Sequence, residues 1–139
     1  MSLTIDQVLA AKDRQMITVK CPEWEGDVCL LPFSGDERDW YDQMMNKKRY
    51  PVDDNGKVST ELADWRGVRA ACIAKAWCNE NGVKPETPIT ELQILALGTK
   101  SGAPIDRCYE ALAKASGLAA NSAEDAEKNL KPAQKGKPG

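Results

Sequence analysis

The stretch CPEWEGDVCLLPFSGDERDWY, residues 21–41, predicts a turn, a strand and the start of a helix in succession. Pro22 and Gly26 punctuate a turn of about five residues, and the apolar run DVCLLPF follows it. The preceding MITVKC alternates, so that Ile17, Val19 and Cys21 point to one side. We therefore predict an antiparallel hairpin over residues 16–33.

The same stretch contains the start of the next helix. Ser34 followed by Glu37 forms a capping-box pattern, and Asp36 adds negative charge where the helix dipole favours it. We expect a helix over about residues 34–48. Its apolar side would consist of Trp40, Tyr41, Met44 and Met45.

The rest of the chain has mainly helical patterns. An N-terminal helical segment, residues 1–15, begins at a Thr4–Gln7 capping-box pattern and has Ile5, Val8 and Leu9 on one face. The predicted fold class is mainly α with a small N-terminal β-hairpin (α+β), with four to five helices in one domain over residues 16–118. The further helices are expected over about residues 59–81, 89–97 and 103–116.

The longest expected helix, residues 59–81, follows a cap at Ser59 or Thr60. Gly67 lies inside it, where glycine costs up to about 1 kcal/mol relative to alanine or permits a close neighbour. We expect both of its tryptophans in the core. Its apolar stripe consists of Leu62, Trp65, Val68, Cys72, Ala76 and Trp77.

Residues 119–139 differ in composition from the rest. SAEDAEKNL would add a weak helix, whereas KPAQKGKPG has two prolines, two glycines, three lysines and nothing large to bury. We expect this segment to be weakly helical and then to end as a disordered basic tail.

The composition removes most enzyme chemistry. The chain has no histidine, which excludes Ser-His-Asp and Cys-His nucleophiles, histidine bases and most zinc sites. No glycine-rich phosphate loop is present. We expect no catalytic residue, no cofactor and no metal site, and therefore not an enzyme. The sequence also shows no signal peptide and no apolar run long enough to span a membrane, so we expect a cytosolic protein.

The five cysteines are expected to be reduced thiols. Seven residues separate Cys21 from Cys29 and five separate Cys72 from Cys78, which does not match the gaps of zinc knuckles. Cys21 and Cys29 could lie close together across the hairpin, which would permit an incidental disulfide. Cys72 and Cys108 lie on apolar stripes, so we expect them to pack as small core residues.

The aromatic residues suggest a surface for a partner. Trp24 is expected at the hairpin tip, away from the core, while Trp40, Tyr41, Met44 and Met45 form a flexible apolar side. Trp and Met are enriched at protein-binding surfaces, and Met can repack around varied partners. These five residues are therefore candidate partner-binding residues, with packing into the core as the alternative for the helical four.

Three segments resemble the tail assembly chaperones of long-tailed, lambda-like bacteriophages. VKCPEWEGDVCLLPFSGDERDWYD resembles the family's strand–PEWGG–strand followed by L-[ST]-G-x-E-R-D. LGTKSGAPIDRCYEALAKASGL resembles its LGxKSxxxxDRxxxxAxxxxGL helix, and SAEDAEKNL resembles its acidic EDAEKN. The resemblance covers about residues 16–130 and departs from the family at Glu25, where glycine is usual.

The resemblance implies a chaperone that binds and solubilises the tape measure protein and assists polymerisation of the tail tube around it. It also implies self-association and a longer product of ribosomal frameshifting that contacts the tail tube protein. The site of action would be the host bacterial cytoplasm, and the protein would be absent from the mature virion. No membrane is implied, and the short basic patches do not favour nucleic-acid binding.

Two alternatives remain open. A small phage or prophage DNA-binding regulator would use helices over residues 59–82 and 103–116 together with the basic tail. A minor structural tail or head–tail connector protein would stay in the finished virion.

Overall fold

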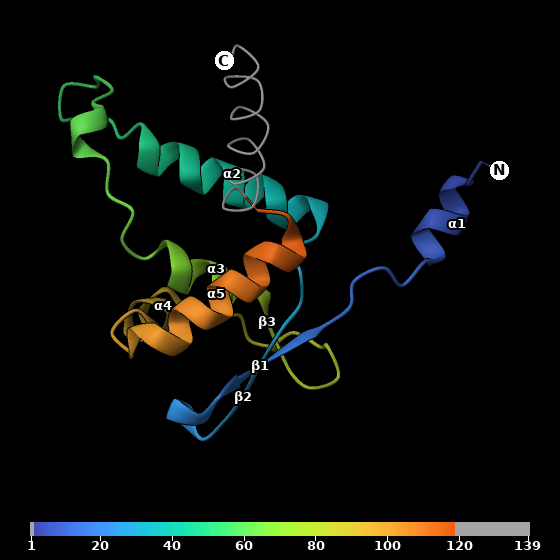
Figure 1. The fold of residues 1–139 in the computed structure, drawn as a ribbon. Coiled ribbons are helices and arrows are strands. Elements are labelled where there is room, and N and C mark those ends of the chain that lie inside the picture. The colour runs from blue at the N-terminus through green and yellow to red at the C-terminus, as the bar shows by residue number, and fades with distance from the viewer. Residues whose placement is uncertain (1, 119–139) are drawn as a thin grey trace, which may run out of the picture.

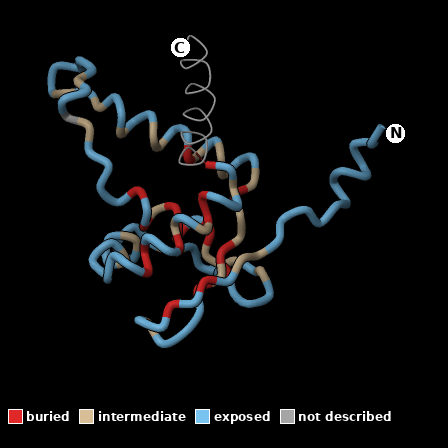
Figure 2. Tube along the Cα trace, in the orientation of Figure 1, coloured by how far each residue is buried: buried red, intermediate tan, exposed pale blue. Residues whose placement is uncertain are grey.

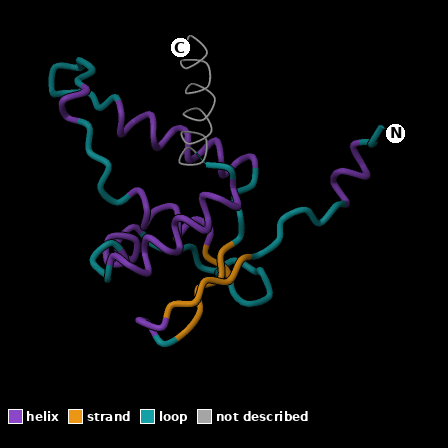
Figure 3. The backbone as a smooth tube through the Cα atoms, in the orientation of Figure 1, coloured by secondary structure: helices purple, strands orange, loops and turns teal. Residues whose placement is uncertain are grey.

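The expected hairpin forms two strands of a three-stranded antiparallel sheet. In the computed structural model, which describes residues 2–118, β1 (Ile17–Cys21) pairs with β2 (Gly26–Leu30). β2 pairs in turn with β3 (Trp77–Cys78), a strand that the sequence patterns did not predict. The described part of the chain also has five α-helices, so the mainly α fold with a small sheet is confirmed (Figures 1 and 3). They are α1 (Ile5–Ala10), α2 (Gly35–Arg49), α3 (Val68–Ala76), α4 (Glu91–Leu97) and α5 (Gly102–Ser116).

The hairpin turn is tight and contains one backbone conformation that is unfavourable for its residue. A 3₁₀ turn, Pro22–Trp24, connects β1 to Glu25, which takes a left-handed conformation with φ 57°. In this conformation a residue with a Cβ is less stable than glycine by about 1 kcal/mol. Glu25 is the position at which the sequence departs from the glycine of the resembling family.

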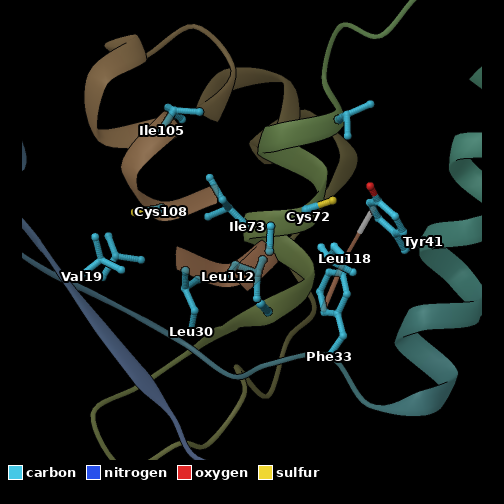
Figure 4. Packing of buried hydrophobic residues seen from close by; sticks show 14 of the residues in the cluster. Val19, Leu30, Phe33, Tyr41, Cys72, Ile73, Ile105, Cys108, Leu112 and Leu118 are labelled. Atoms are coloured by element: carbon cyan, nitrogen blue, oxygen red, sulfur yellow. The ribbon is translucent and has the colours of Figure 1, made fainter. Parts of the chain in front are cut away.

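Buried apolar side chains join the sheet to α3 and α5, and α2 adds Tyr41. Figure 2 shows the buried positions gathered where these elements meet. Figure 4 shows Tyr41 reaching from α2 toward Cys72 on α3, with Phe33 and Leu118 beside it. Burial raises the pKa of the Cys72 thiol to about 12, so this sulfur behaves as an apolar core atom. The core also includes Val19, Leu30, Ile73, Ile105, Cys108 and Leu112.

The expected helix over residues 59–81 is wrong in its N-terminal half. Gly67 has φ 83°, a left-handed conformation that interrupts a right-handed helix, and α3 begins only after it. Residues Thr60–Leu62 form a separate 3₁₀ turn. Because Trp65 lies outside the helix, it is 44% exposed instead of buried.

The same helix ends earlier than expected because the chain enters the sheet. The backbone carbonyl of Ala76 accepts a hydrogen bond from the Leu31 amide, and the next two residues pair with β2 as β3. Asn79 then organises a turn, with its side-chain oxygen accepting from the Asn81 and Val83 amides. Trp77 is therefore a half-buried strand residue.

The other helices agree with the sequence patterns to within a few residues. α4 begins after Thr90, whose side chain accepts from the Gln93 amide in a third capping box. α5 buries Ile105, Cys108 and Leu112 and leaves Ala115 exposed. Residues 119–139, where a weakly helical and then disordered tail was expected, lie outside the described part of the chain.

The N-terminal helical segment is shorter than expected and stands away from the body. Its helix covers only Ile5–Ala10 and is capped by the Thr4–Gln7 box as predicted. Every residue of α1 is exposed (Figure 2). These residues include the apolar Ile5 and Leu9. The extended residues that follow bring Arg14 back to the body.

The Glu37 carboxylate ties three separate segments to the start of α2. It accepts from the Ser34 amide in the capping box, and it also pairs with Arg14 at 2.8 Å and with Lys84. The Lys84 ammonium donates in addition to the backbone carbonyl of Lys75 at the end of α3. Only 13% of the Glu37 side chain is exposed, so these contacts are partly shielded from water.

We expect Glu37→Gln to lower the free energy of unfolding by about 1 kcal/mol and Glu37→Ala by about 2 kcal/mol, measured by urea unfolding. Glutamine retains the capping hydrogen bond but loses both ion pairs. The exposed Glu110→Gln of α5 is the matched control, with an expected change within about 0.5 kcal/mol.

The effect of Glu37 should depend on pH in a defined direction. Partial burial alone would raise the pKa of this carboxyl. The Lys84 hydrogen bond, the Ser34 amide and the nearby cations lower the pKa by more than burial raises it, so the pKa lies below 4.5. The stabilisation is therefore complete above the unfolded pKa and is lost as pH falls through the lower folded pKa. The difference between wild type and Glu37→Gln should shrink below about pH 4.5, and an unchanged difference at pH 3 would contradict the ion-pair assignment.

The effect of Gly67→Ala on the free energy of unfolding has opposite signs for a helix that is broken at Gly67 and for a continuous helix. In a continuous helix alanine would stabilise the protein, whereas at φ 83° it should destabilise it by about 1 kcal/mol. Gly102→Ala is the control, because a Cβ there meets no atom within 4 Å and Gly102 has no positive φ. Urea unfolding followed by circular dichroism measures both changes.

Candidate functional site

The positions of the cysteines do not allow the expected disulfide across the hairpin. Cys21 is opposite Gly26 and Cys29 is opposite Thr18, so the two side chains point to opposite faces of the sheet. The expected proximity of Cys21 and Cys29 is therefore wrong. The structure instead places the Cys21 and Cys108 sulfurs 3.7 Å apart in the core and Cys29 opposite Cys78 across the sheet.

No membrane span or metal cluster is found among residues 2–118. No helix in this range is both long and apolar enough to cross a bilayer. Nor do three or more metal-binding side chains of the His, Cys, Asp or Glu type gather anywhere in it.

The candidate partner-binding residues fall into three different environments. Trp24 packs against the edge of the core, half-buried, so the expectation that it lies away from the core is wrong. Tyr41 is 2% exposed and presents no surface to a partner. Trp40, Met44 and Met45 are half-buried side chains of α2, and the first two line a groove.

Tyr41 is fixed in the core by aromatic and polar contacts. Its ring packs at a tilt against Phe33 with centroids 6.3 Å apart, and its hydroxyl lies 3.5 Å from that of Tyr109. Burial and the neighbouring Tyr109 hydroxyl raise the pKa of Tyr41 well above its ordinary value. Tyr41 therefore attaches α2 to the body, while the Trp40 side of the helix stays accessible.

The groove lies between α2, α3 and the segment that runs through α4, and we call it the α2–α3–α4 groove. Its volume is about 900 Å³. One face of α2 forms a wall through residues spaced by three or four positions, and Trp77 contributes from β3. The apolar lining consists of Trp40, Met44, Ala71, Ala74, Trp77, Pro85, Pro88, Ile89, Ile94 and Leu95.

Contacts between the walls hold the groove open at one end. The Phe33 ring meets Trp40 edge to face, with centroids 6.0 Å apart, which fixes the orientation of the indole. The Lys75 ammonium of α3 lies 4.8 Å from the centroid of the same indole. Together with the Glu37–Lys84 pair, these contacts set the spacing between α2 and α3.

The groove contains residues that the sequence patterns did not single out. Its α4 wall includes Leu95, which is 64% exposed, and its loop wall includes Ile89. The sequence signal for this wall was the short helix ELQILAL, which has more large apolar residues than a seven-residue helix can bury on one face.

Comparison of the chain with protein-family models, with curated proteins and with solved structures gave no match. The candidate site therefore rests on its own geometry and chemistry.

The positions of the cysteines predict how they react with a thiol reagent. Of the five sulfurs, only that of Cys29 belongs to a side chain that is not buried. Burial raises the pKa of the Cys72 and Cys108 thiols to about 12 and also raises that of Cys78, which disfavours the reactive thiolate.

Reaction of the folded protein with a chromogenic disulfide reagent at pH 8 should show one fast thiol, with the other four reacting only after denaturation. Cys29→Ser should remove the fast phase and Cys72→Ala should leave it. A fast phase that survives Cys29→Ser would contradict the described packing.

Proposed function

We propose that this protein is a phage tail assembly chaperone whose α2–α3–α4 groove binds apolar helices of the tape measure protein. The observation that carries the proposal is the groove itself, an apolar channel rimmed by charged side chains. Its volume of about 900 Å³ corresponds to about two turns of an α-helix with its side chains. An amphipathic helix laid into an apolar groove is a recurring mode of peptide recognition.

The side chains of the groove suit a client with a varied sequence. Met44 is unbranched and polarizable, so it can repack around differently shaped apolar residues. Trp40 offers a large apolar surface whose orientation Phe33 and Lys75 maintain. An oriented aromatic side chain beside an adaptable one on the same wall suits a long client with many different apolar segments.

Modest affinity at each groove is compatible with strong binding to a long client. Many copies on one tape measure protein, together with self-association, would add weak contacts into a high overall affinity. Each contact could then be displaced singly as tube subunits polymerise. A longer frameshifted product would recruit the tail tube protein, and the assembly would take place in the host bacterial cytoplasm.

A DNA-binding regulator has less support than it had from the sequence. That alternative used one long helix over residues 59–82, and the chain breaks this helix at Gly67. The lining of the groove is mainly apolar, which does not match a phosphate backbone.

Co-expression with the cognate tape measure protein tests the proposal. The wild-type chain should keep the tape measure protein in the soluble fraction. Leu95→Ser should lower the affinity of the chain for the tape measure protein about tenfold, because it removes an apolar contact inside the groove.

Leu92→Ser is the matched control on the same helix. Leu92 is 77% exposed and lies outside the groove lining, so its loss should leave solubilisation unchanged. If the tape measure protein precipitates equally with and without the wild-type chain, the chaperone proposal fails. Mass spectrometry of purified particles tests the alternative of a structural virion protein, since a chaperone should be absent from them.

A further inference from the structure

We infer that the α2–α3–α4 groove selects amphipathic helices whose apolar stripe is flanked by carboxylates. The inference deepens the proposed function and rests on it for the identity of the natural client. The observation behind it is the distribution of charge around the groove, which differs in sign from that of the rest of the molecule.

Basic side chains are concentrated at the groove. Residues 2–118 contain fifteen Lys and Arg and eighteen Asp and Glu, and the groove lining takes five of the former and two of the latter. The groove lining therefore carries a formal charge of +3 and the remaining described residues −6. The values become +2 and −5 when Asp64, which pairs with Arg66 from outside the lining, is counted with the groove. A groove of one sign on a surface of the other attracts complementary ligands and repels them elsewhere.

The charge on α2 changes along its length. Its first turns carry the exposed Asp36, Asp39 and Asp42, whereas Lys47 and Lys48 of its last turns belong to the groove lining. A client carboxylate is therefore favoured near the C-terminal end of the α2 wall.

Two lysines of the lining, one on each wall, lie beside the apolar side chains that would contact a bound helix. Lys47 extends from the α2 wall and Lys75 from the α3 wall, where its ammonium lies against the Trp40 ring. Lys84 is already neutralised by Glu37, so Lys47 and Lys75 are the more available of these three cations. A helix that buries its apolar stripe against Trp40 and Met44 would place flanking glutamates near both.

The lining argues for a peptide helix over nucleic acid. Met44, Ile94 and Leu95 offer no hydrogen bond to a phosphate. An amphipathic helix supplies both an apolar stripe for the floor and acidic side chains for the rim.

Two synthetic helical peptides test the inference without the natural client. Both carry the same leucine stripe at positions i, i+3, i+4 and i+7, and they differ only in having glutamate or lysine at the flanking positions. Isothermal titration calorimetry at low salt should show the glutamate peptide binding about tenfold more tightly. High salt should reduce the difference.

Charge reversal in the protein locates the preference. Lys47→Glu with Lys75→Glu should abolish the preference for the glutamate peptide. Lys20→Glu with Lys57→Glu is the matched control, because these two exposed lysines lie outside the groove lining and make the same change in net charge. Circular dichroism of both variants checks that they remain folded.

Several outcomes would overturn the inference. Equal binding of both peptides, or tighter binding of the lysine peptide, would show that the rim does not select charge. Competition by a short oligonucleotide that binds more tightly than either peptide would identify the groove as a nucleic-acid site.

A second copy's α1 is the remaining rival occupant, since its apolar residues are exposed. Sedimentation of the wild-type chain tests this rival. If the chain forms a dimer that both peptides dissociate, and if Ile5→Ser with Leu9→Ser abolishes that dimer, the groove binds α1 of a second copy and the inference is overturned.

The failure of the inference can be distinguished from failure of the proposed function. If the Lys47→Glu/Lys75→Glu variant solubilises the tape measure protein as well as wild type does, the charge preference fails and the chaperone role stands. If the glutamate peptide binds selectively while the tape measure protein still precipitates, the preference stands and the chaperone role fails.

Discussion

The arrangement of α2 depends on the Glu37 carboxylate. This one side chain completes the cap of α2, receives Arg14 from the N-terminal segment and pairs with Lys84 from the loop after β3. Through Lys84 it is connected to the last turn of α3, where the Lys75 carbonyl accepts a hydrogen bond. The start of α2, and with it the position of Trp40, is therefore determined by segments far apart in the sequence.

The core explains why α2 can form a wall of the groove while remaining attached. Tyr41 is its buried residue, and the two aromatic neighbours Phe33 and Tyr109 hold it. Burying one large side chain leaves most of the helix surface free. The same helix can then expose Asp39 and Asp42 on one side and contribute Trp40, Met44 and Lys47 to the groove on another.

Local patterns predicted the elements well, because capping and strand alternation depend on neighbouring residues. The Ser34–Glu37 box and the alternation of Ile17, Val19 and Cys21 both appear as expected. The break at Gly67 was missed because glycine is tolerated inside a helical pattern, and its positive φ is required only by the way the chain folds. β3 was missed because a two-residue strand has no period of its own and depends on pairing with β2.

Only part of the candidate site could be predicted, for a related reason. Trp40 and Met44 were found from composition and spacing, whereas Tyr41 shares their pattern but is buried. Lys75, Lys84 and Leu95 come from three other segments, and their convergence on one groove is a property of the tertiary fold.

The two ends of α2 are attached in different ways, and this has a mechanical consequence for the groove. The Glu37 end is fixed by partly buried ion pairs and by Tyr41. The other end is attached through long exposed side chains, with Lys48 donating to the Arg66 carbonyl and Arg49 lying 5.8 Å from the Trp65 ring. A rotation of α2 about its first turns would therefore leave the width of the groove unchanged at the Glu37 end and alter it at the other end.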